Sequence, residues 1–354
     1  MDAGKSLRAA SPPPTPGGRP EIRVFVKARN EAARLPHFLE HYRKLGVDRF
    51  LIVDHESTDA TAALLQAEPD VHLFAAAGSF AAASGGQAWL DTLLDCYGPG
   101  HWCLTVDADE LLCFPDSETL GLPVLCEGLD QEGAEALSAI MLDMYGSEPV
   151  GSAAYAAGEP FLLACPWFDP GPYWRTNPSD DCPPQEIYGG VRQRVFYPHW
   201  QMPSLGLRLS ERCFNVANRS PAIRRNQAVQ SWRAKRPPNL AKVPLVRWRR
   251  GLRYLAVTHR ITPVRLSAGS GCLLHFKFLG DFSGKAVGEA KRGEYFDGAR
   301  EYKRYAAVIA EGSALTLWNE HSVQFQNTAQ LCRLGIMKPL PIAAAPSSRK
   351  AACA

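Results

Sequence analysis

The stretch RFLIVDHESTDAT (49–61) decides the fold class of this 354-residue chain. Its opening RFLIVD is a short apolar run that ends at Asp54, and a run of this length bounded by polar residues is typical of a buried strand. From Thr58 to Ala67 the residues favour a helix, which Ser57 or Thr58 can cap. A strand that passes directly into a helix indicates one unit of a parallel β-α sheet.

The same alternation extends to both sides of this stretch. Apolar runs predict strands over 21–27, 71–76 and 101–107, and helical spacing of apolar residues predicts helices from Leu35 to Leu45 and over 87–97. The connections are short, so we expect an α/β fold with a mostly parallel central sheet and helices on both faces. In such sheets ligands bind at the carboxyl ends of the strands.

The second half of the chain is less regular. Apolar runs predict strands over 136–146 and 273–279, and composition predicts helices over 285–309 and 313–335. GGVRQRVF (189–196) alternates and is expected to form a strand that presents Arg192 and Arg194 on one face. Two guanidinium groups on one face suit a phosphate or an acidic acceptor, and two salt bridges are the alternative.

Composition sets limits on the partners and the surroundings of the chain. Residues 1–20 and 339–354 are rich in Pro, Ala and Ser, and we expect both tails to be disordered. No uninterrupted apolar run approaches about 18 residues, and no signal sequence is apparent, so a cytoplasmic protein is expected. The net charge of +3 argues against nucleic acid as the partner. Residues 208–265 contain fifteen basic residues and one acidic residue, which leaves peripheral association with the inner membrane surface open.

The strongest chemical signal is Asp107-Ala108-Asp109, directly after the apolar run WCLTV. Two carboxylates in this spacing can bind one Mg²⁺ or Mn²⁺ ion, which prefers oxygen ligands and keeps positions free for phosphate oxygens. The alternative is a solvated acidic turn. Because the pair follows an apolar strand in an α/β context, we favour the metal site.

Two further clusters follow the predicted strands. Asp54 can accept hydrogen bonds from a base or a ribose, while Asp59 is expected to cap the following helix. After the first strand, Arg29 is a candidate for contact with a phosphate and Glu31 for contact with a ribose or base. Glu31 could equally cap the first helix.

These phrases together resemble a known family. VKARNEAARLPHFLEHYRKLGVDRFLIVDHESTDAT, GHWCLTVDADELL, KVPLVRW, THRITP and LLHFKFL are similar to the family 2-like glycosyltransferases of bacteria, over about residues 21–310. The resemblance implies a GT-A fold, with a nucleotide-binding half over 21–115 and an acceptor half over 116–310. A C-terminal helical segment is expected over 311–338.

The resemblance also implies an activity and a site. It implies a transferase that moves a sugar from a nucleotide-sugar donor, with Asp54 near the nucleoside and Asp107 and Asp109 near a metal-bound diphosphate. His275 is the best match for a histidine that completes the Mn²⁺ or Mg²⁺ site, and His259 is its rival. Two positions depart from related sequences. The segment SFAAASGG (79–86) stands where relatives usually carry basic residues, and Tyr295 stands where they tend to have a histidine.

An acceptor hydroxyl must lose a proton during glycosyl transfer, and a carboxylate can serve as the general base in an inverting enzyme. Glu186 and Asp143 are the two candidates. The acceptor is expected to be a carbohydrate or a glycolipid, such as a growing cell-surface polysaccharide. Two other functions stay open at this stage: a nucleotidyltransferase on a similar sheet, and a non-catalytic protein that binds a nucleotide-sugar or an anionic glycan.

Overall fold

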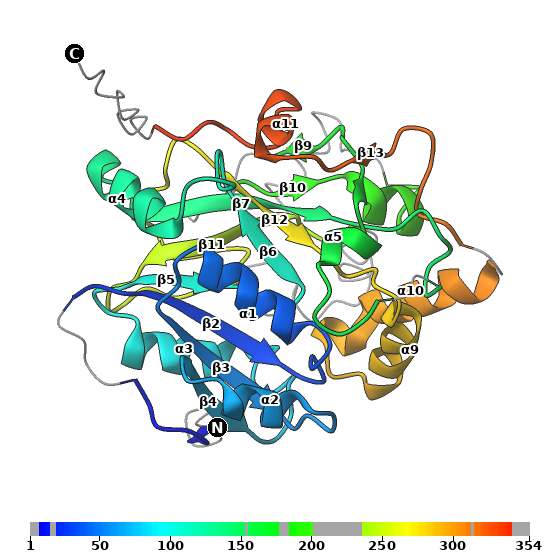
Figure 1. The fold of residues 1–354 in the computed structure, drawn as a ribbon. Helices are drawn as coiled ribbons and strands as arrows, with labels where there is room; N and C mark the ends of the chain where they lie inside the picture. Colours follow the sequence, from blue (N-terminus) through cyan, green and yellow to red (C-terminus); the bar gives the residue numbers. More distant parts are fainter. Residues whose placement is uncertain are drawn as a thin grey trace, which may run out of the picture.

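A nine-stranded sheet crosses the whole molecule in the computed structural model, which describes residues 7–14, 19–152, 155–176, 184–200, 236–312 and 315–341 (Figure 1). The strand order is β1-β4-β3-β2-β5-β11-β7-β12-β6. In chain order the strands are β1 (Leu7–Ala9), β2 (Ile22–Ala28), β3 (Arg49–His55), β4 (Val71–Ala76), β5 (Trp102–Thr105), β6 (Glu110–Cys113), β7 (Ala136–Asp143), β11 (Ala241–Arg247) and β12 (Gly271–His275).

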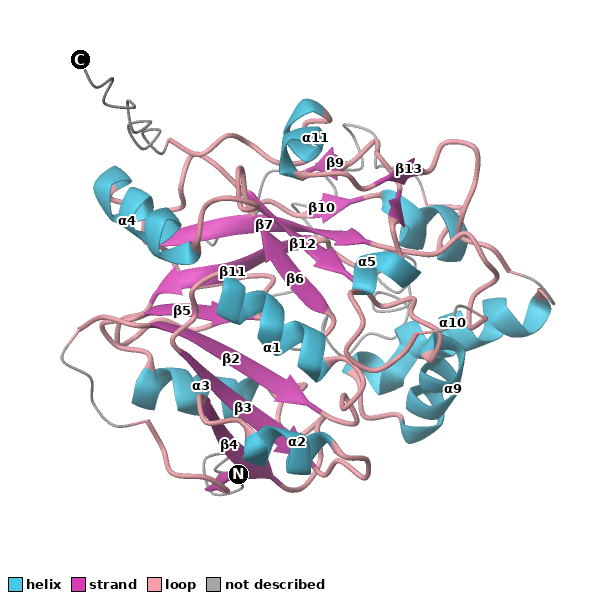
Figure 2. Ribbon diagram, viewed as in Figure 1, coloured by secondary structure: helices cyan, strands magenta, loops and turns pink. Residues whose placement is uncertain are grey.

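Helices and short strand pairs surround this sheet (Figure 2). The helices are α1 (Leu35–Lys44), α2 (Thr61–Ala67), α3 (Gln87–Tyr97), α4 (Leu122–Glu132), α5 (Phe161–Ala164), α9 (Phe282–Arg292), α10 (Phe296–Glu311), α11 (Thr328–Arg333) and the π-helix η2 (Arg192–Phe196). Two small sheets pair β9 (Trp174–Arg175) with β10 (Ile187–Tyr188) and β8 (Trp167–Phe168) with β13 (Val323–Gln324).

The alternation of side chains along β2 explains why helices cover both faces of the sheet. Val24 and Val26 pack into a core that includes α1, whereas Phe25 packs into a second core that includes α3. All three side chains are buried, because both faces of the strand are covered. The prediction of an α/β fold with a mostly parallel sheet and helices on both faces is confirmed.

Strand direction brings the ends of distant segments to one edge. The pairs β4–β3, β3–β2, β2–β5 and β12–β7 are parallel, while β1, β11 and β6 run against the other strands. The starts of β11 and β6 therefore lie at the same edge as the carboxyl ends of β2, β3, β5, β7 and β12. The strand order also reverses between β2 and β5, and such a switch point is where open α/β sheets bind ligands.

Three predictions about local structure are wrong in part. Residues 189–196 do not form a strand, because a π-helix occupies Arg192–Phe196. Within the tail predicted to be disordered, Leu7–Ala9 pairs with β4 and covers that edge of the sheet. Among its described residues, the predicted helical segment 311–338 contains the last residue of α10 and the short helix Thr328–Arg333.

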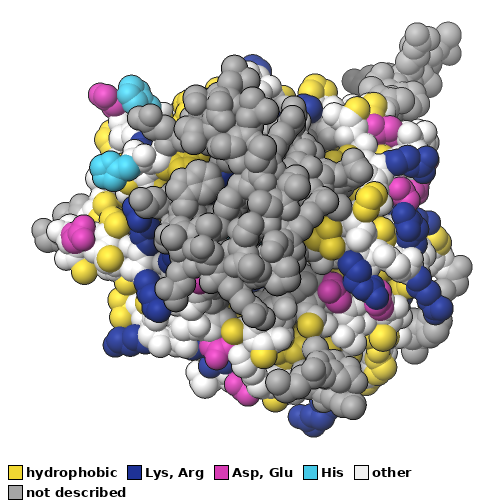
Figure 3. All heavy atoms as spheres, turned by 180° about the vertical axis from the view of Figure 1, so that it is seen from behind, with side chains coloured by type: hydrophobic (Ala, Val, Ile, Leu, Met, Phe, Trp, Pro, Cys, Tyr) yellow, Lys and Arg dark blue, Asp and Glu magenta, His cyan; other side chains and the backbone are white. Residues whose placement is uncertain are grey.

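The basic region can be judged only in part, because 208–235 lies outside the described residues, as does 342–354 of the C-terminal tail. In the described portion, Lys242 is buried, and Arg249 and Arg253 pair with Glu135 and Asp95. Figure 3 shows that the visible Lys and Arg side chains on the rear face are mixed with acidic and apolar ones. Among the described residues, no helix is both long and apolar enough to cross a membrane.

Candidate functional site

The switch point between β2 and β5 places two ammonium groups on one carboxylate. Lys27, near the end of β2, donates from Nζ to Oδ1 of Asp107 at 2.7 Å. Lys242, at the start of β11, lies with its Nζ 3.5 Å from Oδ2 of Asp107 and also donates to Glu110. The Asp107 side chain is 36% exposed, so solvent reaches this group of charges.

The charges around Asp107 determine its protonation. Burial on its own would raise the pKa of Asp107, but Lys27 and Lys242 outweigh that effect and lower it well below its usual range. For Glu110, burial and the nearby Asp107 charge raise the pKa despite Lys242. Burial would lower the pKa of Lys242, but Glu110 and Asp107 raise it, so the ammonium form of Lys242 persists at neutral pH.

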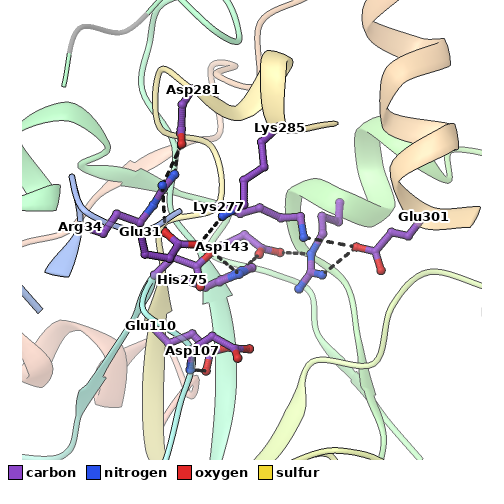
Figure 4. Close-up of polar contacts among 12 residues, drawn as sticks. Glu31, Arg34, Asp107, Glu110, Asp143, His275, Lys277, Asp281, Lys285 and Glu301 are labelled. Atoms are coloured by element: carbon purple, nitrogen blue, oxygen red, sulfur yellow. Dashed lines mark hydrogen bonds and ion pairs between the residues drawn. The ribbon is translucent and has the colours of Figure 1, made fainter. Parts of the chain in front are cut away.

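Asp109 faces a different partner, His275. The imidazole of His275 lies beside Asp143 (Figure 4). Oδ2 of Asp109 lies 3.6 Å from Nε2 of His275, whose Nδ1 lies 2.6 Å from Oδ1 of Asp143. Burial disfavours the charged imidazole, yet Asp109 and Asp143 raise the pKa of His275 overall. His275 is therefore held from one side by Asp143, while its Nε2 is directed toward Asp109.

Arg192 and Arg194 form ion pairs within the protein. Arg192 Nε donates to Asp143 at 2.7 Å, and its Nη1 lies 3.4 Å from Glu301. Arg194 binds Asp169 through Nε at 2.9 Å and Nη2 at 3.0 Å. The predicted shared strand face does not exist, and the structure matches the alternative of two salt bridges. Contact of either arginine with the nucleotide-sugar stays a prediction.

Asp54 lies at the end of β3 with a vacant hydrogen-bonding atom. Its side chain is buried, and its Oδ1 has no hydrogen-bond partner among the described residues. Its Oδ2 receives only a long contact of 3.5 Å from the backbone N–H of Ser57. Asp59, in contrast, accepts from the N–H of Thr61 at 2.9 Å, as expected for a cap of α2. A buried carboxylate oxygen without a donor is a group that a ligand can satisfy.

Arg29 and Glu31 follow β2 but have separate surroundings. Arg29 donates to the carbonyl of His55 at 3.0 Å, which ties the loop after β2 to the end of β3. Glu31 accepts from Lys285 at 2.5 Å and from Arg34 at 3.1 Å. Arg34 in turn binds Asp281, so this cluster joins α1 to α9. Contact of Arg29 or Glu31 with a nucleotide stays a prediction.

Glu186, a candidate general base, and His259, a candidate metal ligand, make their contacts away from the charged groups around Asp107 and Asp109. Glu186 adjoins the small β9–β10 sheet, where it accepts from the hydroxyl of Tyr188 at 3.0 Å. His259 lies with Nδ1 2.7 Å from the carbonyl of Ala241. Burial and the nearby Lys242 lower its pKa to about 4, so His259 is neutral at pH 7. The structure thus brings His275, and not His259, to face Asp109.

A divalent cation fits one part of this edge. The described residues contain no group of three or more His, Cys, Asp or Glu side chains that could hold a metal ion. Mg²⁺ in particular binds through one or two protein ligands and completes its shell with substrate phosphates and water. Asp109 and His275 supply a carboxylate oxygen and an imidazole nitrogen, and Asp143 fixes the imidazole as outer-shell carboxylates do in metal sites. Asp107 differs because ammonium groups contact both of its oxygens.

The loop that departs from related sequences is attached to the C-terminal helices. The ring of Phe80 lies 5.1 Å from that of Tyr295, centroid to centroid. Glu294, between α9 and α10, accepts from the hydroxyl of Ser79 at 2.7 Å and from the N–H of Ala81 at 2.9 Å. Ser79 and Ala81 are thus hydrogen-bonded to the turn between α9 and α10, and Phe80 packs against it.

Sequence reasoning missed Lys27 and Lys242. Both are basic residues inside apolar strand segments, EIRVFVK and AKVPLV, where burial of a charge requires a partner. That signal marks each lysine as unusual. It cannot show that the two meet, because β11 joins the sheet beside β5 only in three dimensions.

Comparison with known proteins gives partial structural likenesses. No family model matches the chain, and no curated protein matches it. A 4-diphosphocytidyl-2C-methyl-D-erythritol synthase matches with TM-score 0.26 and 20% identity, over 39% of this chain and 68% of that one. Glucosyl-3-phosphoglycerate synthase from Mycobacterium tuberculosis, in complex with Mn²⁺, UDP and phosphoglyceric acid, matches with TM-score 0.24 and 16% identity, over 36% and 44%. The UDP-glucose pyrophosphorylase from Acinetobacter baumannii matches with TM-score 0.24 and 10% identity, over 40% and 64%. All three are enzymes of nucleotide or nucleotide-sugar chemistry, and likenesses this partial carry no argument about the site.

Proposed function

We propose that this chain is a glycosyltransferase that binds a nucleotide-diphosphate sugar at the carboxyl edge of the sheet and transfers the sugar to an acceptor hydroxyl. The acceptor in this proposal is a carbohydrate or a glycolipid. The chemistry requires three features at one place: a contact for the nucleoside, a cation site for the diphosphate and a carboxylate near the acceptor. The residues at this edge supply the first two.

One observation carries the proposal. Asp109 and His275 face each other with 3.6 Å between Oδ2 and Nε2, and Asp143 holds the far side of the imidazole at 2.6 Å. These groups come from the loop before β6 and from the ends of β12 and β7, so the sheet itself fixes their positions. A carboxylate and an oriented imidazole suit Mn²⁺ or Mg²⁺ with open positions for phosphate oxygens.

Each residue has a defined part in the transfer. Asp109 and His275 would hold the cation, which when bound offsets negative charge that develops on the leaving diphosphate. Asp54 would accept a hydrogen bond from the ribose or base through its unpartnered Oδ1. The bond between the anomeric carbon and the diphosphate oxygen breaks, a bond to the acceptor oxygen forms, and the acceptor proton passes to a base.

The geometry separates the two candidates for that base. Asp143 is fully engaged with Arg192 and His275, and their charges hold its pKa below the usual range despite burial, which by itself raises it. We assign Asp143 the positioning of His275. Glu186 is partly exposed and accepts a hydrogen bond from the hydroxyl of Tyr188, so it keeps the base role in this proposal.

The released product tests the proposal. Purified protein would be incubated with UDP-, GDP- and CDP-sugars in Mn²⁺ or EDTA, and the nucleotide product would be identified by chromatography. Glycosyl transfer or slow donor hydrolysis releases a nucleoside diphosphate, and Asp109→Ala should abolish that release. The exposed Glu40→Gln variant on α1 serves as the control and should behave as the wild type.

Two other outcomes of this experiment would show a nucleotidyltransferase or a binding protein instead of a glycosyltransferase. Consumption of a nucleoside triphosphate with release of pyrophosphate would show a nucleotidyltransferase. The sequence KARNEAARL after β2 lacks the glycine-rich loop expected for that class. Tight binding of a nucleotide-sugar without any release of nucleotide would show a binding protein.

A further inference from the structure

We propose that the two aspartates of Asp107-Ala108-Asp109 have separate tasks: Asp109 serves the cation, whereas Asp107 holds Lys27 and Lys242 as a pair that binds the diphosphate directly. This inference rests on the proposed function and adds an anion-binding pair that the family resemblance does not supply. It also removes Asp107 from the set of metal ligands.

The contacts of Asp107 are the first argument. Lys27 reaches its Oδ1 at 2.7 Å from β2, and Lys242 lies 3.5 Å from its Oδ2 on β11. These strands flank β5 on its two sides, so the carboxylate lies between two ammonium groups that the sheet holds in place. A divalent cation at either oxygen would meet a like charge at close range.

The orientation of Asp109 is the second argument. Its side chain is 16% exposed and faces His275, so the neighbouring carboxylates of the motif look toward different partners. The cation site and the lysine pair are therefore adjacent but distinct.

The unused hydrogen-bond donors are the third argument. Each ammonium group carries three N–H donors. In the described part of the chain, Lys27 uses one on Asp107, and Lys242 uses two, on Asp107 and Glu110. Six donors minus these three leave three for phosphate oxygens. Asp107 is 36% exposed and Lys27 15%, so a ligand can reach Lys27 from solvent, whereas Lys242 is only 4% exposed and lies behind Asp107.

The position of Lys27 and Lys242 in the sheet agrees with a role in binding the diphosphate. The pair occupies the switch point between β2 and β5, and Asp54 ends β3 one strand away. Asp54 and Lys27 therefore lie at the same edge of the sheet, on neighbouring strands. Lysine is well suited to this task because its compact ammonium group acts as a point charge toward phosphate.

Calorimetric titration of UDP, GDP and inorganic pyrophosphate, in EDTA and in Mn²⁺, tests the pair. Lys27→Gln should weaken binding by about tenfold or more in the same buffer, because a charge-assisted hydrogen bond is lost. Lys242 is buried against Glu110, so it is tested as Lys242→Gln with Glu110→Gln, which removes both charges together and protects folding. Lys44→Gln, an exposed lysine on α1, is the matched control and should leave binding unchanged.

Manganese binding to the nucleotide-free protein, measured by electron paramagnetic resonance, tests the division between the aspartates. Asp109→Asn should remove Mn²⁺ binding, whereas Asp107→Asn should retain it within about twofold. Loss of Mn²⁺ binding in Asp107→Asn, or unchanged nucleotide affinity in both lysine variants, would overturn the inference and leave the proposed function standing. If the wild type binds no nucleotide in either buffer, the proposed function itself fails.

Discussion

Asp143 balances the charges of two buried side chains, Arg192 and His275. It accepts from Arg192 at 2.7 Å and from His275 at 2.6 Å, and its side chain is 2% exposed. Removing one partner from a buried ion pair leaves an uncompensated charge in the interior. We therefore expect Asp143→Asn to lower the free energy of unfolding by about 3–5 kcal/mol, measured by urea titration.

An exposed pair provides the contrast to Asp143. Glu40 and Lys44 form an ion pair on α1 with side chains 55% and 74% exposed. Glu40→Gln should change the same free energy far less than Asp143→Asn does, because water screens the pair. Equal losses in the two variants would show that burial of Asp143 does not set its contribution.

His259 makes stability depend on pH. Its pKa is about 4 in the folded protein, first because of burial and then because of Lys242, against an ordinary value of 6.5. Between these pH values the unfolded chain binds the proton and the folded protein does not, so stability falls as pH falls. The ring is partly exposed, which reduces the effect to about 1–2 kcal/mol between pH 7 and pH 5.

His259→Gln isolates this contribution, since the amide of Gln can still donate to the Ala241 carbonyl. The variant should lose about 1–2 kcal/mol less than the wild type between pH 7 and pH 5, when urea titrations at the two pH values are compared. His41, whose pKa burial also lowers to about 4, remains in both proteins and cancels in the comparison. Identical pH dependence in the two proteins would contradict the assignment.

At the scale of elements, the start of α3 controls the position of Lys27. Gly86 precedes this helix with φ of 77°, and a Cβ there would lie 2.8 Å from Cδ of Lys27 and 3.0 Å from Phe80. Gly86→Ala should therefore displace Lys27 and weaken UDP binding several-fold in calorimetry. It should also lower the free energy of unfolding by about 1–3 kcal/mol more than Gly100→Ala does.

Gly100 is the matched control because its φ is 87° but no atom lies within 4 Å of an added Cβ. Both variants carry the backbone cost of a positive φ, and only Gly86→Ala adds the steric contact. If the two variants bind UDP equally well, α3 does not set the position of Lys27.

Local patterns predicted the elements that need only local information. The strands over 21–27, 49–54 and 71–76 and helices α1 and α3 follow from the spacing of apolar residues in each segment. The pattern over 189–196 predicts a strand because Arg192 and Arg194 alternate with Val191, Gln193 and Val195, but Arg192–Phe196 forms a π-helix. Its backbone instead follows the ion pairs of these arginines with Asp143 and Asp169, which are distant in sequence.

Local sequence patterns also fail to predict contacts in the site between residues that are distant in the chain. Asp54 and Asp109 could be named as candidates from the sequence because each ends or follows an apolar run, whereas His275 was named only through the family resemblance. The division between Asp107 and Asp109 could not be predicted from the sequence, because it depends on β11, which places Lys242 beside Asp107 across a separation of 135 residues. Strand order, and not local composition, decides which charges meet at this edge.

At the scale of the whole molecule, β11 joins the two halves of the sheet into one folding unit. It pairs with β5 on one side and with β7 on the other, and Leu245 on this strand is fully buried. Leu245→Ala should lower the free energy of unfolding by about 2–5 kcal/mol.

Because the sheet is continuous, we expect the loss to appear equally in both halves. Hydrogen exchange at Ile52 in β3 and Leu273 in β12 should accelerate by the same factor, whereas Leu255→Ala at an exposed position should accelerate neither. Faster exchange in only one half would show that residues 21–115 and 116–310 unfold separately.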